Sequence, residues 1–100
     1  MVHVAGVFTM DPAEREAFLA GRADLMRHSR AEQGCQEYTF SADPLEPGRV
    51  VLFERWDSQA DLDAHLAGLS GPAAPAVTGP EAATSWISIY DIAGERPLRR

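Results

Sequence analysis

Two residues of this sequence, His65 and Glu54, are candidates for acid–base chemistry. His65 shares one face of a predicted helix with three leucines, Leu62, Leu66 and Leu69. Its imidazole is therefore expected to point inward. A lone inward histidine is more often a core residue hydrogen-bonded to a neighbour than a proton acceptor. Periodicity alone leaves both interpretations open.

Glu54 lies in a predicted hairpin, whose two strands are 36–42 and 49–56. The DPLEPG sequence between these strands is typical of a loop. We take Ala42 to pair with Arg49. Glu37 and Glu54 then stand directly opposite each other, and facing like charges are unfavourable. Either the two carboxylates are solvated at an edge of the sheet, or one of them is neutral in a pocket.

The same register divides the side chains of the hairpin between two faces. One face carries Tyr38, Phe40, Val51 and Phe53. The other carries Cys35, Glu37, Thr39, Leu52, Glu54 and Trp56. Apolar residues on both faces predict that both faces are covered.

No nucleophile or metal centre can be recognised in the sequence. Cys35 has no histidine arranged to activate it, so we expect a small buried thiol. The three histidines are too scattered in sequence to predict a metal site. Four aromatic residues could line a cavity for a planar ligand, and they equally suit a core or an interface. These are Tyr38, Trp56, Trp86 and Tyr90.

The composition is that of one small soluble domain. The chain has 100 residues, of which 45% are apolar and 24% are charged, and its net charge is −6. An acidic balance argues against a nucleic-acid groove and against an anionic membrane surface. All nine basic residues are arginine, which excludes Schiff-base chemistry on lysine. With no secretory leader and no apolar run of membrane-spanning length, we expect a cytoplasmic protein.

Hydrophobic periodicity predicts six elements in the order β-α-β-β-α-β. The first strand is 2–9, the first helix runs from Pro12 to about Glu32, and the hairpin follows. The second helix begins after Ser58, and the last strand is 85–92. The Pro-rich segment 68–83 is predicted to be irregular, and 94–100 forms a tail.

This order predicts an α+β fold of the ferredoxin-like split type, formed by a single domain over residues 1–100. Two helices would cover one face of a four-stranded antiparallel sheet. The other face also carries apolar residues, so we expect a homodimer joined sheet to sheet.

Several of these residues together resemble one known family. The matching sequences are SRAEQGC at 29–35, Tyr38, VLFERWDS at 51–58, and then Leu62 and His65. In this order and spacing they are similar to the antibiotic biosynthesis monooxygenases, which include the quinol monooxygenases. The resemblance covers residues 2 to about 67 and the closing strand.

The resemblance implies a dimeric α+β barrel and an oxygenase that needs neither metal nor flavin. Such enzymes oxidise phenols, anthrones or quinols with O₂. A deprotonated, delocalised aromatic can itself reduce O₂, so the protein need only hold it in a dry pocket and accept a proton. The implied partners are therefore a small aromatic substrate, O₂ and a second copy of the chain, with no cofactor.

The resemblance also implies roles for particular residues. His65 matches a helix position that faces the pocket, and Glu54 matches a strand glutamate that could orient His65 for acid–base catalysis. Trp56 matches a tryptophan that lines the cavity, and Tyr38 matches a strand tyrosine. Substrate-binding positions are Trp56, Tyr38, Leu52 and Leu62.

The sequence also departs from the family, and two other functions stay open. The first strand lacks asparagine and no histidine follows His65, which disfavours the haem-degrading branch. The 68–83 segment replaces or shortens a helix and could form part of the pocket wall. The alternatives are a non-catalytic dimeric barrel that binds a small aromatic ligand, and a polyketide cyclase or isomerase on the same fold.

Overall fold

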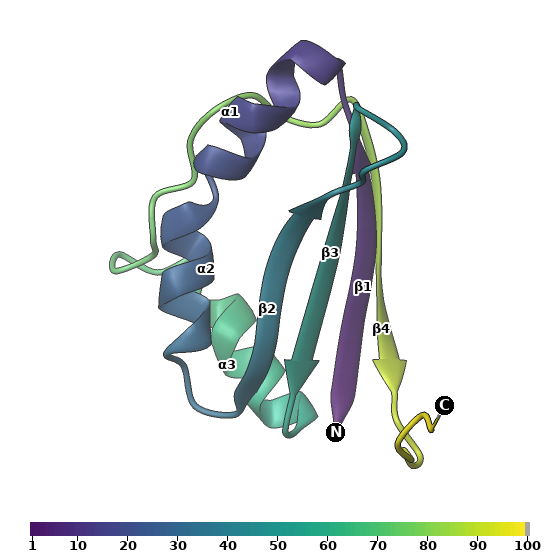
Figure 1. The fold of residues 1–100 in the computed structure, drawn as a ribbon. Helices are drawn as coiled ribbons and strands as arrows, with labels where there is room; N and C mark the ends of the chain where they lie inside the picture. Colours follow the sequence, from purple (N-terminus) through teal and green to yellow (C-terminus); the bar gives the residue numbers. More distant parts are fainter. Residues whose placement is uncertain (100) are drawn as a thin grey trace.

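The computed structural model describes residues 1–99, and it shows one antiparallel sheet with helices on one of its faces (Figure 1). The strands are β1 (Val2–Thr9), β2 (Cys35–Ala42), β3 (Arg49–Trp56) and β4 (Thr84–Asp91), in the spatial order β2-β3-β1-β4. The helical elements are η1 (Pro12–Glu14), α1 (Arg15–Ala20), α2 (Ala23–Arg30) and α3 (Gln59–Gly68). This arrangement confirms the predicted α+β ferredoxin-like fold. Residue 100, the last residue of the predicted tail, lies outside the described residues.

The predicted long first helix is broken into two pieces at Gly21 and Arg22. Asp11 begins the helical region as expected, because its carboxylate accepts a hydrogen bond of 2.9 Å from the Ala13 N–H. The break occurs where the 71–83 segment crosses the helices. There the Thr78 N–H donates to the Gly21 carbonyl at 3.1 Å, and a Cβ at Gly21 would lie only 1.9 Å from the Thr78 oxygen. A tertiary contact therefore ends α1, which helical periodicity could not predict.

The 71–83 segment contains neither helix nor strand and passes outside α2 and α1 before β4 begins (Figure 1). Gly79 in this segment has φ = +83°, and a Cβ there would lie 2.7 Å from the Ala17 carbonyl oxygen.

We expect Gly79→Ala to lower the free energy of unfolding by about 1–3 kcal/mol, because it adds backbone strain to a clash. Urea denaturation measures this change. The control is Gly94→Ala, which meets no atom within 4 Å and should leave stability unchanged.

The hairpin register differs from the prediction by one residue. Ala42 pairs with Val50, and the loop is closed by Asp43 and Arg49, whose backbone N–H and carbonyl are 3.0 Å apart. The Asp43 carboxylate also accepts from the Arg49 side chain at 2.8 Å, so this pair extends the ladder by one residue. A slip of one residue exchanges the two faces of a strand relative to its neighbour.

The predicted division of the hairpin side chains was therefore wrong. Tyr38 pairs with Glu54 and Phe40 with Leu52, so these four residues share one face. Glu37 instead pairs with Arg55 on the opposite face, where the Arg55 guanidinium binds Glu95. The predicted opposition of two glutamates does not occur.

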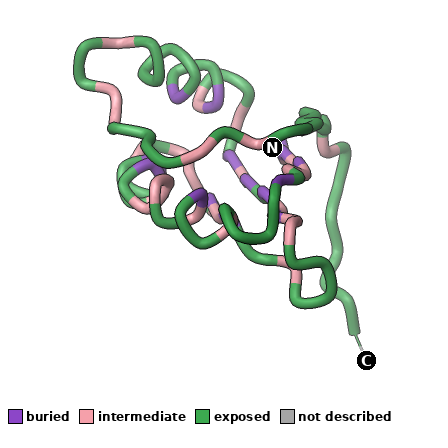
Figure 2. The backbone as a smooth tube through the Cα atoms, turned by 90° about the horizontal axis from the view of Figure 1, so that it is seen from above, coloured by how far each residue is buried: buried purple, intermediate pink, exposed green. Residues whose placement is uncertain are grey.

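The core lies between the helices and one face of the sheet. Along β1 and β3, buried residues alternate with less buried ones, as Figure 2 illustrates. The largest fully buried side chains include Trp56, Phe18, Leu62 and His65. Every residue of β4 is exposed, because β4 is the edge strand beyond β1 and the helices lie over the opposite side of the sheet. Within residues 1–99, no helix is long and apolar enough to cross a membrane.

Candidate functional site

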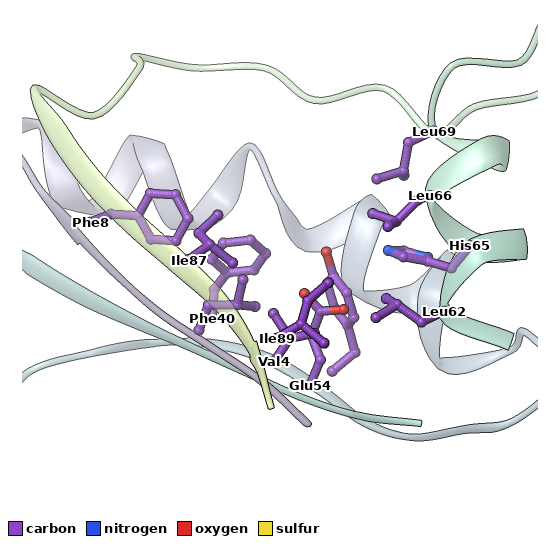
Figure 3. Close-up of a pocket in the computed structure, with 12 residues that line it drawn as sticks. Val4, Phe8, Phe40, Glu54, Leu62, His65, Leu66, Leu69, Ile87 and Ile89 are labelled. Carbon is purple, nitrogen blue, oxygen red and sulfur yellow. The ribbon is translucent and has the colours of Figure 1, made fainter. Parts of the chain in front are cut away.

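A cavity of about 280 Å³ lies between α3 and the helix-covered face of the sheet (Figure 3). Tyr38, Glu54 and His65 are the three lining residues with polar side chains. The other nine lining side chains are valine, leucine, isoleucine or phenylalanine, and they include the predicted Leu52 and Leu62. Five of the six predicted site residues therefore surround one cavity.

His65 is held by α3, which begins as the sequence predicts. The Ser58 hydroxyl caps the helix by accepting from the Asp61 N–H at 3.1 Å. Leu62 and His65 then face the sheet, and only 2% of His65 is exposed. In Figure 3 the imidazole extends from α3 toward the cavity. The predicted inward orientation is confirmed.

The partner of His65 is Glu32, a residue that the sequence analysis did not select. Nδ1 of His65 lies 2.5 Å from a carboxylate oxygen of Glu32, which follows α2. In the neutral imidazole, a carboxylate at this distance favours the tautomer with its proton on Nδ1, which leaves the lone pair of Nε2 for a ligand. Glu32 was part of the SRAEQGC motif, which was the only sequence signal for it. Glu54, which was expected to orient His65, has a different partner.

Glu54 is bound by Trp56, its neighbour on the same face of β3. The indole N–H of Trp56 donates to the Glu54 carboxylate at 2.9 Å, and 6% of Glu54 is exposed. Burial raises the pKa of the Glu54 carboxyl, although the Trp56 hydrogen bond and nearby His65 act in the opposite direction. Trp56 is fully buried and its ring lies 4.7 Å from that of His65. Trp56 therefore supports Glu54 and His65. Contrary to the prediction, Trp56 is not itself among the residues that line the cavity.

The raised pKa of Glu54 predicts a pH dependence of stability. The folded protein binds the Glu54 proton more tightly than the unfolded chain, so stability falls as pH rises from the ordinary glutamate value of 4.5 through the folded pKa. Glu54→Gln keeps the acceptor for Trp56 but cannot ionise. Its stability relative to the unmodified protein should therefore increase with pH, which urea denaturation at about pH 5 and about pH 8 would measure.

Glu37→Gln is the matched control for this experiment. Hydrogen bonding from Thr39 lowers the pKa of the Glu37 carboxyl, so this charge stabilises the fold above the ordinary glutamate pKa. Because this contribution is lost only as pH falls below that value, the relative stability of Glu37→Gln should be nearly the same at about pH 5 and about pH 8. If the relative stability of Glu54→Gln is likewise the same at both pH values, burial does not raise the pKa of Glu54 as described here.

Tyr38 completes the polar end of the cavity as a neutral hydrogen-bonding group. Its ring lies 5.3 Å from His65, and 3% of the residue is exposed. Burial and the Glu54 carboxylate raise the pKa of the Tyr38 hydroxyl, so it keeps its proton.

Burial and nearby Glu54 likewise raise the pKa of the Cys35 thiol, which disfavours a nucleophilic thiolate. In the described part of the chain, no three His, Cys, Asp or Glu residues form a group that could hold a metal ion.

Comparison with known proteins identifies related sequences. A sequence model of the antibiotic biosynthesis monooxygenase family matches residues 1–70. An uncharacterized protein of Synechocystis is 37% identical over 63 residues, which are 63% of this chain and 43% of that protein. This chain therefore matches less than half of the Synechocystis protein. YcnE of Bacillus subtilis, named as a proposed monooxygenase, is 31% identical over 65 residues, which are 65% of this chain and 68% of YcnE.

Solved structures share the fold over nearly the whole chain. A proposed antibiotic biosynthesis monooxygenase from Deinococcus radiodurans superposes with a TM-score of 0.77 at 20% identity, covering 100% of both chains. A protein from Mycobacterium tuberculosis has a TM-score of 0.69 at 26% identity, covering 96% of this chain and 98% of its own. The fold thus continues beyond residue 70, where the family match ends.

Proposed function

Since the chain belongs to the antibiotic biosynthesis monooxygenase family, we propose that it uses O₂ to oxidise a phenolic, anthrone or quinol substrate without a cofactor. One observation carries the proposal: a buried imidazole, backed by the Glu32 carboxylate, extends toward a cavity with nine apolar side chains among its twelve lining residues. An aromatic anion formed in such a cavity can transfer electrons to O₂ itself. The protein then has to supply a proton acceptor and exclude water.

His65 accepts the proton in the first step. Its Nε2 takes a proton from the ring hydroxyl of a phenol or quinol, or from the CH₂ group of an anthrone, and the imidazole becomes positively charged. Glu32, whose side chain is partly exposed, holds the Nδ1 proton and compensates this charge beside the buried imidazole. The substrate anion is delocalised over its rings, which makes it a one-electron donor.

O₂ then forms a bond to a ring carbon of the substrate. The anion passes an electron to O₂, which gives a substrate radical and superoxide. These two radicals combine to form a peroxide, and the peroxide takes back a proton from His65. Loss of water leaves a carbonyl group, so that for an anthrone R₂CH₂ + O₂ gives R₂C=O + H₂O. Glu54, when protonated, donates a hydrogen bond to the substrate oxygen, and Trp56 positions Glu54. Tyr38, Leu52 and Leu62 contact the rings.

The active form that we propose is a homodimer joined through the uncovered face of the sheet, opposite the cavity. That face carries half-buried Val7 and Val51 and the more exposed Phe53, Trp86 and Tyr90. A second copy of the same face would remove these side chains from water. We place this dimer in the cytoplasm, where a lone cysteine such as Cys35 stays reduced.

Oxygen uptake by the purified, metal-stripped protein tests the proposal. With a panel of anthrones and quinols, uptake should exceed autoxidation, scale with protein concentration and persist with a chelator. Tight binding of a panel member without uptake would instead indicate the non-catalytic barrel. A product with the mass of its substrate would indicate a cyclase or isomerase.

A further inference from the structure

The cavity opens between α3 and β4 through a rim of aliphatic side chains, and we propose that this rim binds an uncharged aliphatic side chain on the substrate. The inference rests on the proposed function, because it assumes that the oxidised ring sits at His65. It adds that the ring carries a hydrocarbon substituent directed away from His65.

Polar and apolar residues are separated within the cavity. Tyr38, Glu54 and His65 are 6% exposed or less, and they come from β2, β3 and α3. The side chains at the end of α3 and on β4 are aliphatic, as Figure 3 shows for Leu66, Leu69 and Ile87, and they are much more exposed than the three polar residues. One end of the cavity can therefore bind a ring hydroxyl, whereas the other end offers no hydrogen bond from a side chain.

The rim residues are four of the large apolar side chains that are left partly in water. Their exposed fractions are 46% for Leu66, 37% for Leu69, 52% for Ile87 and 50% for Ile89. They continue directly from the buried lining of the cavity, and Ile87 pairs with Gly6 of β1, which has no side chain. A Cβ at Gly6 would lie 3.0 Å from Cγ1 of Ile87. A glycine inside a strand marks a place of close approach.

The chemistry of the rim selects the type of substituent. Among the lining residues of the described chain, none is arginine or lysine, so apart from His65 at the buried end no basic side chain would pair with an anionic substituent. The Glu32 carboxylate beside His65 would repel an anion. A compact substrate would leave the four aliphatic side chains in water, whereas a hydrocarbon chain would cover them.

A series of hydroquinones with no side chain, a propyl chain and a hexyl chain tests the proposal through oxygen uptake. We expect kcat/KM to rise about threefold for each methylene that contacts the rim, because each buried CH₂ leaves water. The gain should end once the chain extends beyond the rim. If kcat/KM is the same for all three compounds, the rim does not bind the substituent.

Substitution of a rim residue locates the effect. Ile87→Thr keeps a β-branched residue on an exposed strand but makes it polar, so the ratio of kcat/KM between the hexyl and the unsubstituted compound should fall at least fivefold. Val77→Thr is the matched control, because Val77 is also 50% exposed but lies in the 71–83 segment, outside the cavity lining. Equal ratios in both variants would overturn the assignment.

A binding measurement separates this proposal from the proposed function. Alkylphenols with the same three substituents, titrated under argon with tryptophan fluorescence as the signal, report affinity without turnover. Affinity that rises with chain length supports the rim even if no oxygen uptake is found, in which case only the oxygenase proposal fails. Affinity independent of chain length, with oxygen uptake present, overturns the rim alone. The affinity could also depend on chain length only after the protein is diluted to monomers. This result would mean that a second copy covers the rim, and it would overturn the proposal.

Discussion

Replacement of His65 by asparagine is expected to lower kcat by about 10²–10⁴-fold, which is the usual contribution of a positioned general base. Asparagine can still donate to Glu32 from its amide nitrogen, so the contact beside α2 is kept. The basic Nε2 is lost, and no other lining side chain can replace it, because Tyr38 keeps its proton and Glu54 is shifted toward its neutral form. The measurement is oxygen uptake under substrate saturation, with thermal unfolding to verify the fold.

His28→Asn is the control for this variant. His28 is exposed on α2, and its Nε2 lies 4.0 Å from the other carboxylate oxygen of Glu32. It shares a partner with His65 but is not among the cavity residues, so kcat should stay within about twofold, as is usual for a surface change. If His65→Asn also keeps kcat within about threefold of the unmodified protein, His65 is a hydrogen-bonded core residue and no general base.

Replacement of Glu32 by glutamine is expected to lower kcat by about 100-fold while KM changes little. The amide can donate to Nδ1, which favours the tautomer whose proton is on Nε2 and thereby blocks the lone pair that accepts the substrate proton. The positive charge on the imidazole also loses its compensating carboxylate. Because Glu32 does not line the cavity, its loss should act on the chemical step and not on binding.

The double variant His65→Asn, Glu32→Gln distinguishes positioning from a general structural role. If Glu32 acts through His65, the double variant should be no slower than His65→Asn alone. Independent effects would multiply, and this result would contradict the pairing. Glu46→Gln, an exposed carboxylate in the β2–β3 loop, should leave kcat unchanged.

The fold could be predicted where local signals agreed. The Ser58 cap, the leucine spacing of α3 and the alternation in the strands predicted elements that the structure contains. Two features depended on tertiary contacts and were missed. The break at Gly21 depends on Thr78, which is far along the chain, and the hairpin register depends on how Asp43 binds Arg49 inside the loop.

The site could be predicted less completely than the fold. Periodicity placed His65 and Leu62 on the inward face of α3, and the structure confirms this. The mistaken register separated Tyr38 from Leu52 and Glu54, although all three line the cavity. The contact between Glu32 and His65 joins residues 33 positions apart, so only the folded chain reveals it.

Oxygen-isotope labelling of the product tests the central claim most directly, namely that His65 starts an oxygenation of an aromatic substrate. The protein would be incubated with an anthrone or alkylhydroquinone under labelled O₂ in unlabelled water, and the product analysed by mass spectrometry. The account predicts one labelled oxygen atom per product molecule, with a rate of formation that His65→Asn reduces to near the autoxidation background. Product without label, or labelled product formed equally well by His65→Asn, would contradict it.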